Sequence, residues 1–100
     1  MTQVELAQVE LARSAVEDLR RIVLTHSLPP DTLRRVGASL EPLRAFPRLG
    51  QELEGRWHGF RFVVGPWRWM LMVYRHIPED DRVVVVTVQD ARTSSAVTTR

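Results

Sequence analysis

Apolar residues in the first half of the chain recur at spacings of three and four, which is the period of an amphipathic helix. Over residues 12–26 the apolar positions are Ala12, Ala15, Val16, Leu19, Ile22 and Val23. The Leu28-Pro29-Pro30 sequence follows, and proline both lacks an amide donor and restricts the residue before it. We therefore predict a helix over residues 12–26.

A second helix is predicted after the two prolines, with Asp31 or Thr32 as its N-cap. Its apolar positions are Leu33, Val36, Leu40 and Leu43. Pro42 should end or kink this helix near Glu41. Because the connection between the two helices is short, we expect them to pack as an antiparallel hairpin.

The second half of the chain has the pattern of β-strands, with β-branched and aromatic residues between turn signals. The predicted strands are residues 56–64, 67–77 and 83–88. The last of these is almost entirely valine, which favours a central strand that is covered on both faces. The connections are short, and short connections favour antiparallel neighbours.

The N-terminal segment alternates between apolar and polar residues, which predicts a short strand at about residues 2–8. This strand is expected to join the sheet at its edge, and the element order becomes β-α-α-β-β-β. We predict an α+β fold in which an N-terminal helical hairpin packs on a small, mostly antiparallel sheet. The length suits a single domain that covers residues 1–100.

Strand alternation divides residues 67–77 between two faces of the sheet. One face carries Trp67, Trp69, Leu71 and Val73, and the other carries Arg68, Met70, Met72, Tyr74 and His76. We expect the first face to pack under the helices. The second would then be a half-exposed surface, apolar enough to bind a partner and basic enough to bind an anion.

Composition excludes several classes of protein. The chain has no cysteine, so it can form neither a disulfide framework nor a thiolate metal site. No apolar run approaches the length of a membrane-spanning helix, and the first residues lack the basic start and apolar block of a signal peptide. We expect a cytoplasmic protein that needs no cofactor and contacts no membrane.

All fourteen cationic residues are arginines. Codon usage in a genome of high GC content is a sufficient explanation, but every cation can still hold a phosphate or carboxylate by two hydrogen bonds. No acidic residue lies between Gly55 and Pro78, and this stretch contains Arg56, Arg61, Arg68 and Arg75. These arginines either create a positive surface or are ordinary strand residues paired with Glu52, Glu54 or Asp90.

The histidines do not form a metal-binding pattern, because His26, His58 and His76 fall on three different predicted elements. Imidazole titrates near neutral pH, so His58 and His76 are candidates for an acid or base. The alternative is that each is an ordinary surface or hydrogen-bonded histidine.

Several short motifs resemble the RelE/ParE superfamily of bacterial type II toxins. They are Ala15-Val16-Glu17-Asp18-Leu19, Phe46-Pro47-Arg48-Leu49-Gly50, Gly59-Phe60-Arg61, Gly65-Pro66-Trp67-Arg68 and Gln89-Asp90-Ala91-Arg92. The resemblance covers almost the whole chain and agrees with the predicted element order. It implies a toxin that a cognate antitoxin holds inactive, as a homodimer or a toxin–antitoxin heterotetramer.

Two activities occur in this superfamily: RelE-like members cleave mRNA on the ribosome, and ParE-like members block DNA gyrase. In the ribonuclease branch, the resemblance places the catalytic cations at Arg61, Arg68 and Arg92. Such cations would stabilise the charge that develops when a ribose 2′-hydroxyl attacks the adjacent phosphate. The candidate contacts to RNA or another anion are Arg56, Arg61, Arg68, His58 and Tyr74.

The sequence also departs from the ribonuclease pattern. Val63 stands where that branch has a second basic residue, and residues 94–100 contain neither tyrosine nor histidine for proton transfer. Loss of a general base lowers a rate by about 10²–10⁴-fold. The chain is thus a candidate ribosome-dependent endoribonuclease without an obvious base, and His58, His76 or Tyr74 could substitute.

Other interpretations stay open on the sequence alone. A gyrase inhibitor and an inactive member of the superfamily both fit the motifs. A different class also fits, namely a small non-catalytic module that dimerises or docks through its Met70 and Met72 strand face.

Overall fold

The computed structural model describes residues 6–93, 96 and 97. The helices within these residues are α1 (Arg13–Thr25), α2 (Thr32–Leu40) and the single turn α3 (Pro42–Ala45). The strands are β1 (Gln8–Leu11), β2 (Gln51–Glu52), β3 (Arg61–Val64), β4 (Met70–Ile77) and β5 (Arg82–Asp90). Short 3₁₀ turns occur at η1 (Gly55–Trp57) and η2 (Pro78–Asp80).

The strands form one mixed sheet in the order β1-β5-β4-β3-β2. β1 runs parallel to β5 at one edge, and the other neighbours are antiparallel. The predicted α+β class, the antiparallel meander and the internal position of the valine strand are confirmed. β2 was not predicted, because a strand of two residues has no periodicity to detect.

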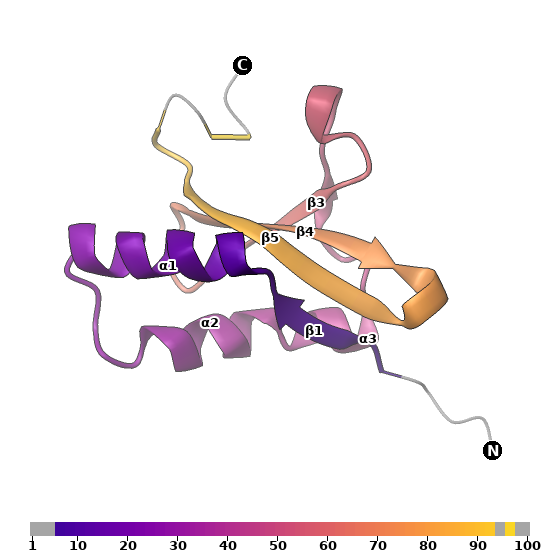
Figure 1. Cartoon of the computed structure of the whole chain (residues 1–100), viewed down its shortest axis with the longest axis horizontal. Coiled ribbons are helices and arrows are strands. Elements are labelled where there is room, and N and C mark those ends of the chain that lie inside the picture. The colour runs from indigo at the N-terminus through magenta and orange to yellow at the C-terminus, as the bar shows by residue number, and fades with distance from the viewer. Residues whose placement is uncertain (1–5, 94–95, 98–100) are drawn as a thin grey trace.

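Both long helices lie on the same side of the sheet (Figure 1). The core joins buried residues of α1, α2 and α3 to Met70, Met72 and Tyr74 of β4. The helical residues in this core are Ala15, Leu19, Ile22, Val36, Leu40 and Leu43. The two methionines and the tyrosine are completely buried, at 0% exposure.

The prediction of which face of β4 the helices cover was therefore wrong for the strand itself, although Trp67 and Trp69, in the turn before it, do pack against this core. Leu71 and Val73, on the opposite face, are also buried, at 3% and 0% exposure, so both faces are apolar and alternation alone cannot distinguish them. The module that would dock through Met70 and Met72 is excluded by the same burial.

An irregularity in the pairing of β5 explains why this strand contributes buried side chains to the core over its whole length. Val73 pairs with Thr87 but Tyr74 pairs with Val85, so Val86 is an extra residue. Such a bulge shifts the alternation of side chains by one position. As a result Val88, as well as Val83 and Val85, faces the helices.

Side chains of helix α1 form hydrogen bonds with backbone groups at the edge of β5, beyond the point where β1 ends. The Ser14 hydroxyl donates to the Val86 carbonyl. The Asp18 carboxylate accepts hydrogen bonds from the Val88 amide at 3.2 Å and from the Thr87 hydroxyl. Side chains of a helix thus replace a neighbouring strand for these backbone groups.

Three predicted strand boundaries were wrong. Residues 56–60 form η1 and a turn, and β3 begins only at Arg61. Residues 67–69 belong to the turn before β4. The first strand is Gln8–Leu11, and residues 1–5 lie outside the described part of the chain.

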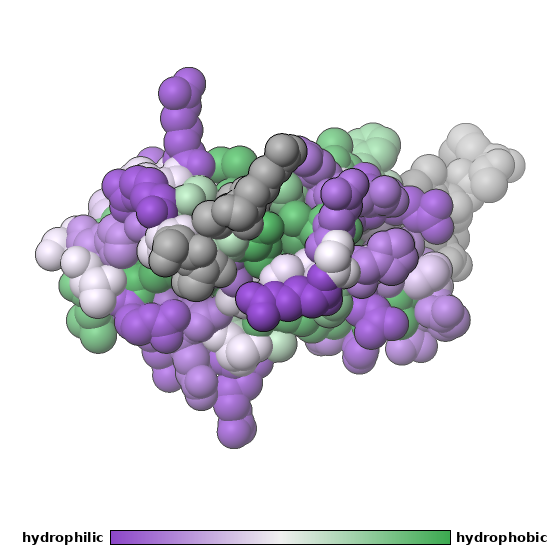
Figure 2. All heavy atoms as spheres, turned by 90° about the horizontal axis from the view of Figure 1, so that it is seen from above, coloured by the Kyte–Doolittle hydropathy of each residue, from purple (hydrophilic) through white to green (hydrophobic). Residues whose placement is uncertain are grey.

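The surface is mixed in polarity. Figure 2 shows one face of the molecule, on which hydrophilic side chains surround smaller apolar areas. Large apolar side chains that are exposed include Leu24, Leu33, Phe46 and Leu49. Among the helices of residues 6–93, none is long and apolar enough to cross a membrane.

Candidate functional site

The loop of residues 46–50, which connects α3 to β2, is held by the only tyrosine of the chain. The Tyr74 hydroxyl donates to the Pro47 carbonyl at 2.7 Å and accepts from the Gly50 amide at 2.9 Å. Burial raises the pKa of Tyr74 above 10.0, against the opposing effects of the Gly50 hydrogen bond and of Arg61. Because Tyr74 is fully buried, it cannot contact RNA, and that prediction was wrong.

Gly50 has to be glycine for this arrangement to form. A Cβ at this position would lie 2.6 Å from the Phe62 carbonyl oxygen and 2.8 Å from the Tyr74 hydroxyl. The clash with a backbone oxygen cannot be relieved by a side-chain rotation. The close approach of the loop to β3 and β4 therefore depends on the missing side chain.

Arg61 holds the same loop from β3. Its guanidinium donates to the carbonyl oxygens of Gly50 at 2.8 Å and Arg48 at 3.2 Å, and to the Glu52 carboxylate at 2.8 Å. The side chain is 23% exposed. The prediction of Arg61 as a phosphate ligand stays a prediction, and the structure adds a second role, the positioning of the loop.

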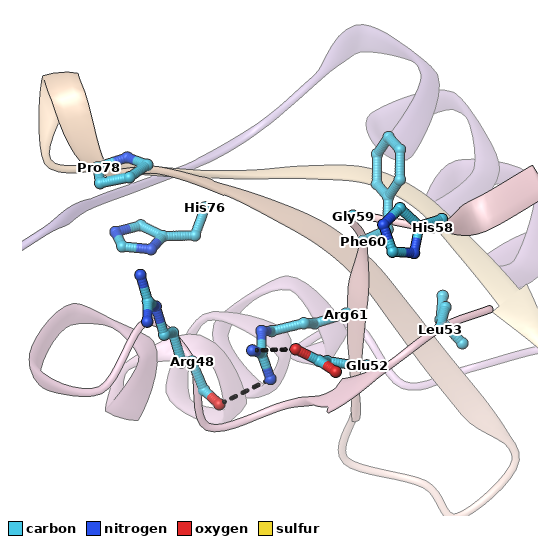
Figure 3. A pocket seen from close by; sticks show the side chains of 9 residues that line it. All are labelled: Arg48, Glu52, Leu53, His58, Gly59, Phe60, Arg61, His76 and Pro78. Atoms are coloured by element: carbon cyan, nitrogen blue, oxygen red, sulfur yellow. Dashed lines mark hydrogen bonds and ion pairs between the residues drawn. The ribbon is translucent and has the colours of Figure 1, made fainter.

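A cavity of about 340 Å³ lies beside this loop. Its polar lining consists of Arg48, Glu52, His58, Arg61 and His76. Figure 3 shows His76 next to Arg48 on one side and His58 on the opposite side, with Arg61 between them. The fold therefore brings together two guanidinium and two imidazole groups from the loop, from β3, from β4 and from the turn after η1. We call this cavity the arginine–histidine pocket.

The charge of the pocket is positive. Its described lining contains one acid, Glu52, whose side chain is 75% exposed and paired with Arg61. An ion pair this exposed contributes only about 0–1 kcal/mol, so an incoming phosphate can compete for Arg61. Guanidinium and imidazolium groups are suited to bind a phosphodiester, and imidazoles can also move protons.

Arg68 and Arg56 do not line this pocket. Arg68 is exposed in the turn before β4 rather than on a strand, and Arg56 is exposed in η1. Neither has an ion pair or a side-chain hydrogen bond to another described residue. Their roles as anion contacts stay predictions.

Arg92 occupies a different part of the sheet and is already paired. It binds Asp90 through two hydrogen bonds, at 2.9 and 2.7 Å, and its guanidinium lies 4.9 Å from the ring of Trp69. His26 stacks on the same indole at 4.6 Å and contacts Asp90 at 2.9 Å. The hydrogen bond from Arg92 is the main reason that the pKa of Asp90 is well below its usual range.

Two of the three arginines that the resemblance assigned to catalysis, Arg61 and Arg92, lie at different points along β4, and the catalytic role of all three stays a prediction. Arg61 lies opposite Tyr74, whereas Asp90, the partner of Arg92, lies opposite Met70. At about 3.3 Å per residue, these positions are about 13 Å apart along β4. Pairing of Arg61 with Glu52 and of Arg92 with Asp90 agrees with the alternative of ordinary strand ion pairs.

Arg48 was missed as a site residue from sequence, and His76 was named as a candidate acid or base without its proximity to Arg48. Arg48 is in the loop and lies far from His76 in sequence, so no spacing connects them. The alternation of residues in β4 could be read from the sequence, and it places His76 on the same face as Tyr74. The loop motif could also be recognised from the sequence. What was missing was the folding of the loop against that end of β4. The described residues contain no group of acidic or histidine side chains suited to a metal ion.

Comparison with known proteins agrees with this architecture. The toxin–antitoxin complex RelBE2 of Mycobacterium tuberculosis contains a chain 25% identical to this one, with a TM-score of 0.65 over 85% of this chain and 98% of that chain. The chromosomal ParDE system of P. aeruginosa gives 12% identity and a TM-score of 0.67 over 87% and 98%. The intact E. coli RelBE complex gives 18% identity and a TM-score of 0.65 over 87% of this chain and 99% of that chain. No curated protein sequence gives a significant match.

The fold is thus that of the small α+β toxins of the RelE/ParE superfamily. Residues 9–94 match the family model described as the ParE toxin of the type II toxin–antitoxin system parDE. The chain belongs to this ParE toxin family.

Proposed function

We propose that this protein is the toxin of a type II toxin–antitoxin module, that it acts in the cytoplasm on mRNA during translation, and that a cognate antitoxin neutralises it. The observation that carries the choice of target is the arginine–histidine pocket. Residues 94–100 lack the tyrosine or histidine that the ribonuclease branch uses, and the substitutes named from sequence, His58 and His76, line this pocket with Arg48 and Arg61. These are the groups that cleavage of a phosphodiester requires.

The proposed reaction is an intramolecular transfer. A ribose 2′-hydroxyl oxygen attacks the adjacent phosphorus while one imidazole accepts its proton. The bond from phosphorus to the 5′-oxygen breaks, and the other imidazole, as the imidazolium, donates a proton to that oxygen. The products are a 2′,3′-cyclic phosphate and a free 5′-hydroxyl. Arg48 and Arg61 stabilise the additional negative charge on the phosphoryl oxygens.

The antitoxin is proposed to bind an apolar groove that α1 and α2 enclose. Its lining includes Val16, Val23, Leu24 and Leu33, and its volume is about 400 Å³. Leu24 and Leu33 are 80% and 68% exposed, which is unfavourable for side chains of this size without a partner. An amphipathic helix of the antitoxin would bury them. The complexes named for the M. tuberculosis and E. coli relatives support a partner of this kind.

Two measurements test the proposal. Induced expression should stop growth, and co-expression of the small reading frame adjacent to the gene should restore it. In a reconstituted translation reaction, primer extension should detect cleaved mRNA, and His76→Gln should lower the cleavage rate by about 10²–10⁴-fold. Arg34→Gln is a matched surface control, because Arg34 is exposed on α2 and far from the pocket. Full cleavage by both His58→Gln and His76→Gln variants would exclude this active site.

A second target, DNA gyrase, is favoured by a different observation. Arg61 and Arg92, two of the cations expected to act in one ribonuclease centre, are each paired with a carboxylate at different points along β4. A toxin that acts by binding alone does not require such a centre. Inhibition of DNA supercoiling by purified gyrase, with no mRNA cleavage, would establish this alternative.

A further inference from the structure

A second, shallow hollow adjoins the arginine–histidine pocket. It is lined by Phe46, Pro47, Arg48, Leu49 and His76. Arg48 and His76 line both hollows and therefore form the boundary between them. The pocket on one side of this boundary has a mixed lining that includes two guanidinium groups, whereas the hollow on the other side is mainly apolar.

The apolar side chains of this hollow project into solvent. Phe46 is 65% exposed and Leu49 is 59% exposed. They are held in this position because side chains of β3 and β4 form hydrogen bonds with the backbone of the loop. Tyr74 binds the Pro47 carbonyl and the Gly50 amide, and Arg61 binds the carbonyl oxygens of Arg48 and Gly50.

A fixed loop that presents an exposed phenyl ring beside a guanidinium and an imidazole group has the composition of a binding site for one nucleotide unit. An aromatic ring stacks on any base, and the adjacent cations bind the phosphate that follows it. A duplex does not offer an unstacked base, so the arrangement selects a single strand.

We infer that the Phe46–Leu49 hollow seats a nucleobase of single-stranded RNA, with the phosphate next to that base bound between Arg48 and His76. The inference rests on the proposed action on RNA and specifies how the substrate is positioned there. Phe46 is then a positioning residue, and Arg48 and His76 contact the phosphate. Glu52 is the opposing charge in the adjoining pocket and is not part of the base seat.

Fluorescence anisotropy of a labelled uridine hexanucleotide can test the base seat. The double comparison uses the wild-type protein and Phe46→Ala, each with the hexanucleotide and with the same sugar–phosphate backbone lacking bases. Stacking of one base corresponds to roughly a 5- to 160-fold change in affinity. We expect Phe46→Ala to lose this factor on the hexanucleotide and to bind the abasic strand as the wild type does.

A matched control is Leu6→Ala, which removes another large, exposed apolar side chain just before β1, outside both proposed binding surfaces. It should leave both affinities unchanged. Arg48→Gln should weaken binding to both strands and reduce the slope of log affinity against log salt by about 0.7, the value for one phosphate contact on a single strand. Arg34→Gln, which removes the same charge elsewhere, should leave this slope unchanged.

An equal loss for Phe46→Ala on both strands would overturn the base seat, because the ring would then act only through the fold. Equal binding of a duplex and of the single strand would also overturn it. These outcomes are separable from the fate of the proposed reaction, since binding is measured on the isolated oligonucleotide. A base seat without mRNA cleavage would mean that the proposed catalytic role of the histidines fails while this inference stands.

Discussion

Replacement of Tyr74 by phenylalanine removes one oxygen atom and disconnects the loop of residues 46–50 from β4. The hydroxyl donates to the Pro47 carbonyl and accepts from the Gly50 amide, and both the tyrosine and Gly50 are buried. An unsatisfied buried polar group costs about 1–3 kcal/mol. Pro47 is only partly buried and can recover water, so we expect the free energy of unfolding to fall by about 2–3 kcal/mol in Tyr74→Phe.

The assay is urea denaturation at pH 7, in which unfolding is monitored by circular dichroism. In a domain of this length, about 2–3 kcal/mol corresponds to a lower melting temperature by roughly 10–20 °C. Thr25→Val is a suitable control, because Thr25 is exposed and its hydroxyl contacts only neighbours in sequence, the Ile22 carbonyl at 3.4 Å and the His26 ring at 2.9 Å, so that water can replace it. That variant should change the free energy of unfolding by less than about 0.5 kcal/mol.

The alkaline limb of the stability curve provides an independent measure of the same hydroxyl. The pKa of Tyr74 is raised in the folded state, so the unfolded chain releases this proton first as the pH rises. Its contribution to stability is complete below pH 10 and is lost as the pH rises through the folded pKa. Because the chain has a single tyrosine, absorbance of tyrosinate reports this group alone. A Tyr74→Phe variant with wild-type stability would refute the hydrogen-bonded anchor.

Two further predictions concern the carboxylates of Asp18, which binds β5 from α1, and of Asp90, the last residue of β5. Asp18→Ala should lower the free energy of unfolding by about 1–3 kcal/mol in urea denaturation, because the Val88 amide loses its acceptor; wild-type stability would show that water replaces the carboxylate. Asp90 has a pKa below its usual range, so its stabilising contribution is present above pH 4 and is lost as the pH falls toward the folded value. Asp90→Asn should remove most of this acid sensitivity from the melting temperature, and an unchanged acid limb in that variant would contradict the assignment to Asp90.

The strongly periodic parts of the fold could be predicted from the sequence. Helix α1 follows a stripe with regular spacing, and Pro42 ends α2 at Leu40, as expected from its missing amide. The valine run is an internal strand because its side chains suit burial on both faces. In these segments local propensity and tertiary packing favour the same structure.

Other features depend on contacts that have no local signal. The buried face of β4 was misassigned because Trp67 and Trp69, which made the other face look larger, lie in the turn before the strand. Val86 resembles its neighbours, so the bulge could not be located in a run of valines. The pocket depends on the folded loop bringing Arg48 beside His76, and the hydroxyl that holds the loop is distant in sequence.

The covering of β5 by α1 also affects how this protein behaves beside other copies of itself. An open strand edge is a template on which a second chain can add its own strand, and such additions lead to swapped dimers or aggregates. The Ser14 hydroxyl donates a hydrogen bond to the Val86 carbonyl, and the Asp18 carboxylate accepts one from the Val88 amide. The negative charge of Asp18 also lies along this edge. A toxin released from its antitoxin would therefore be protected from self-association along this part of the sheet by two short polar side chains of a helix.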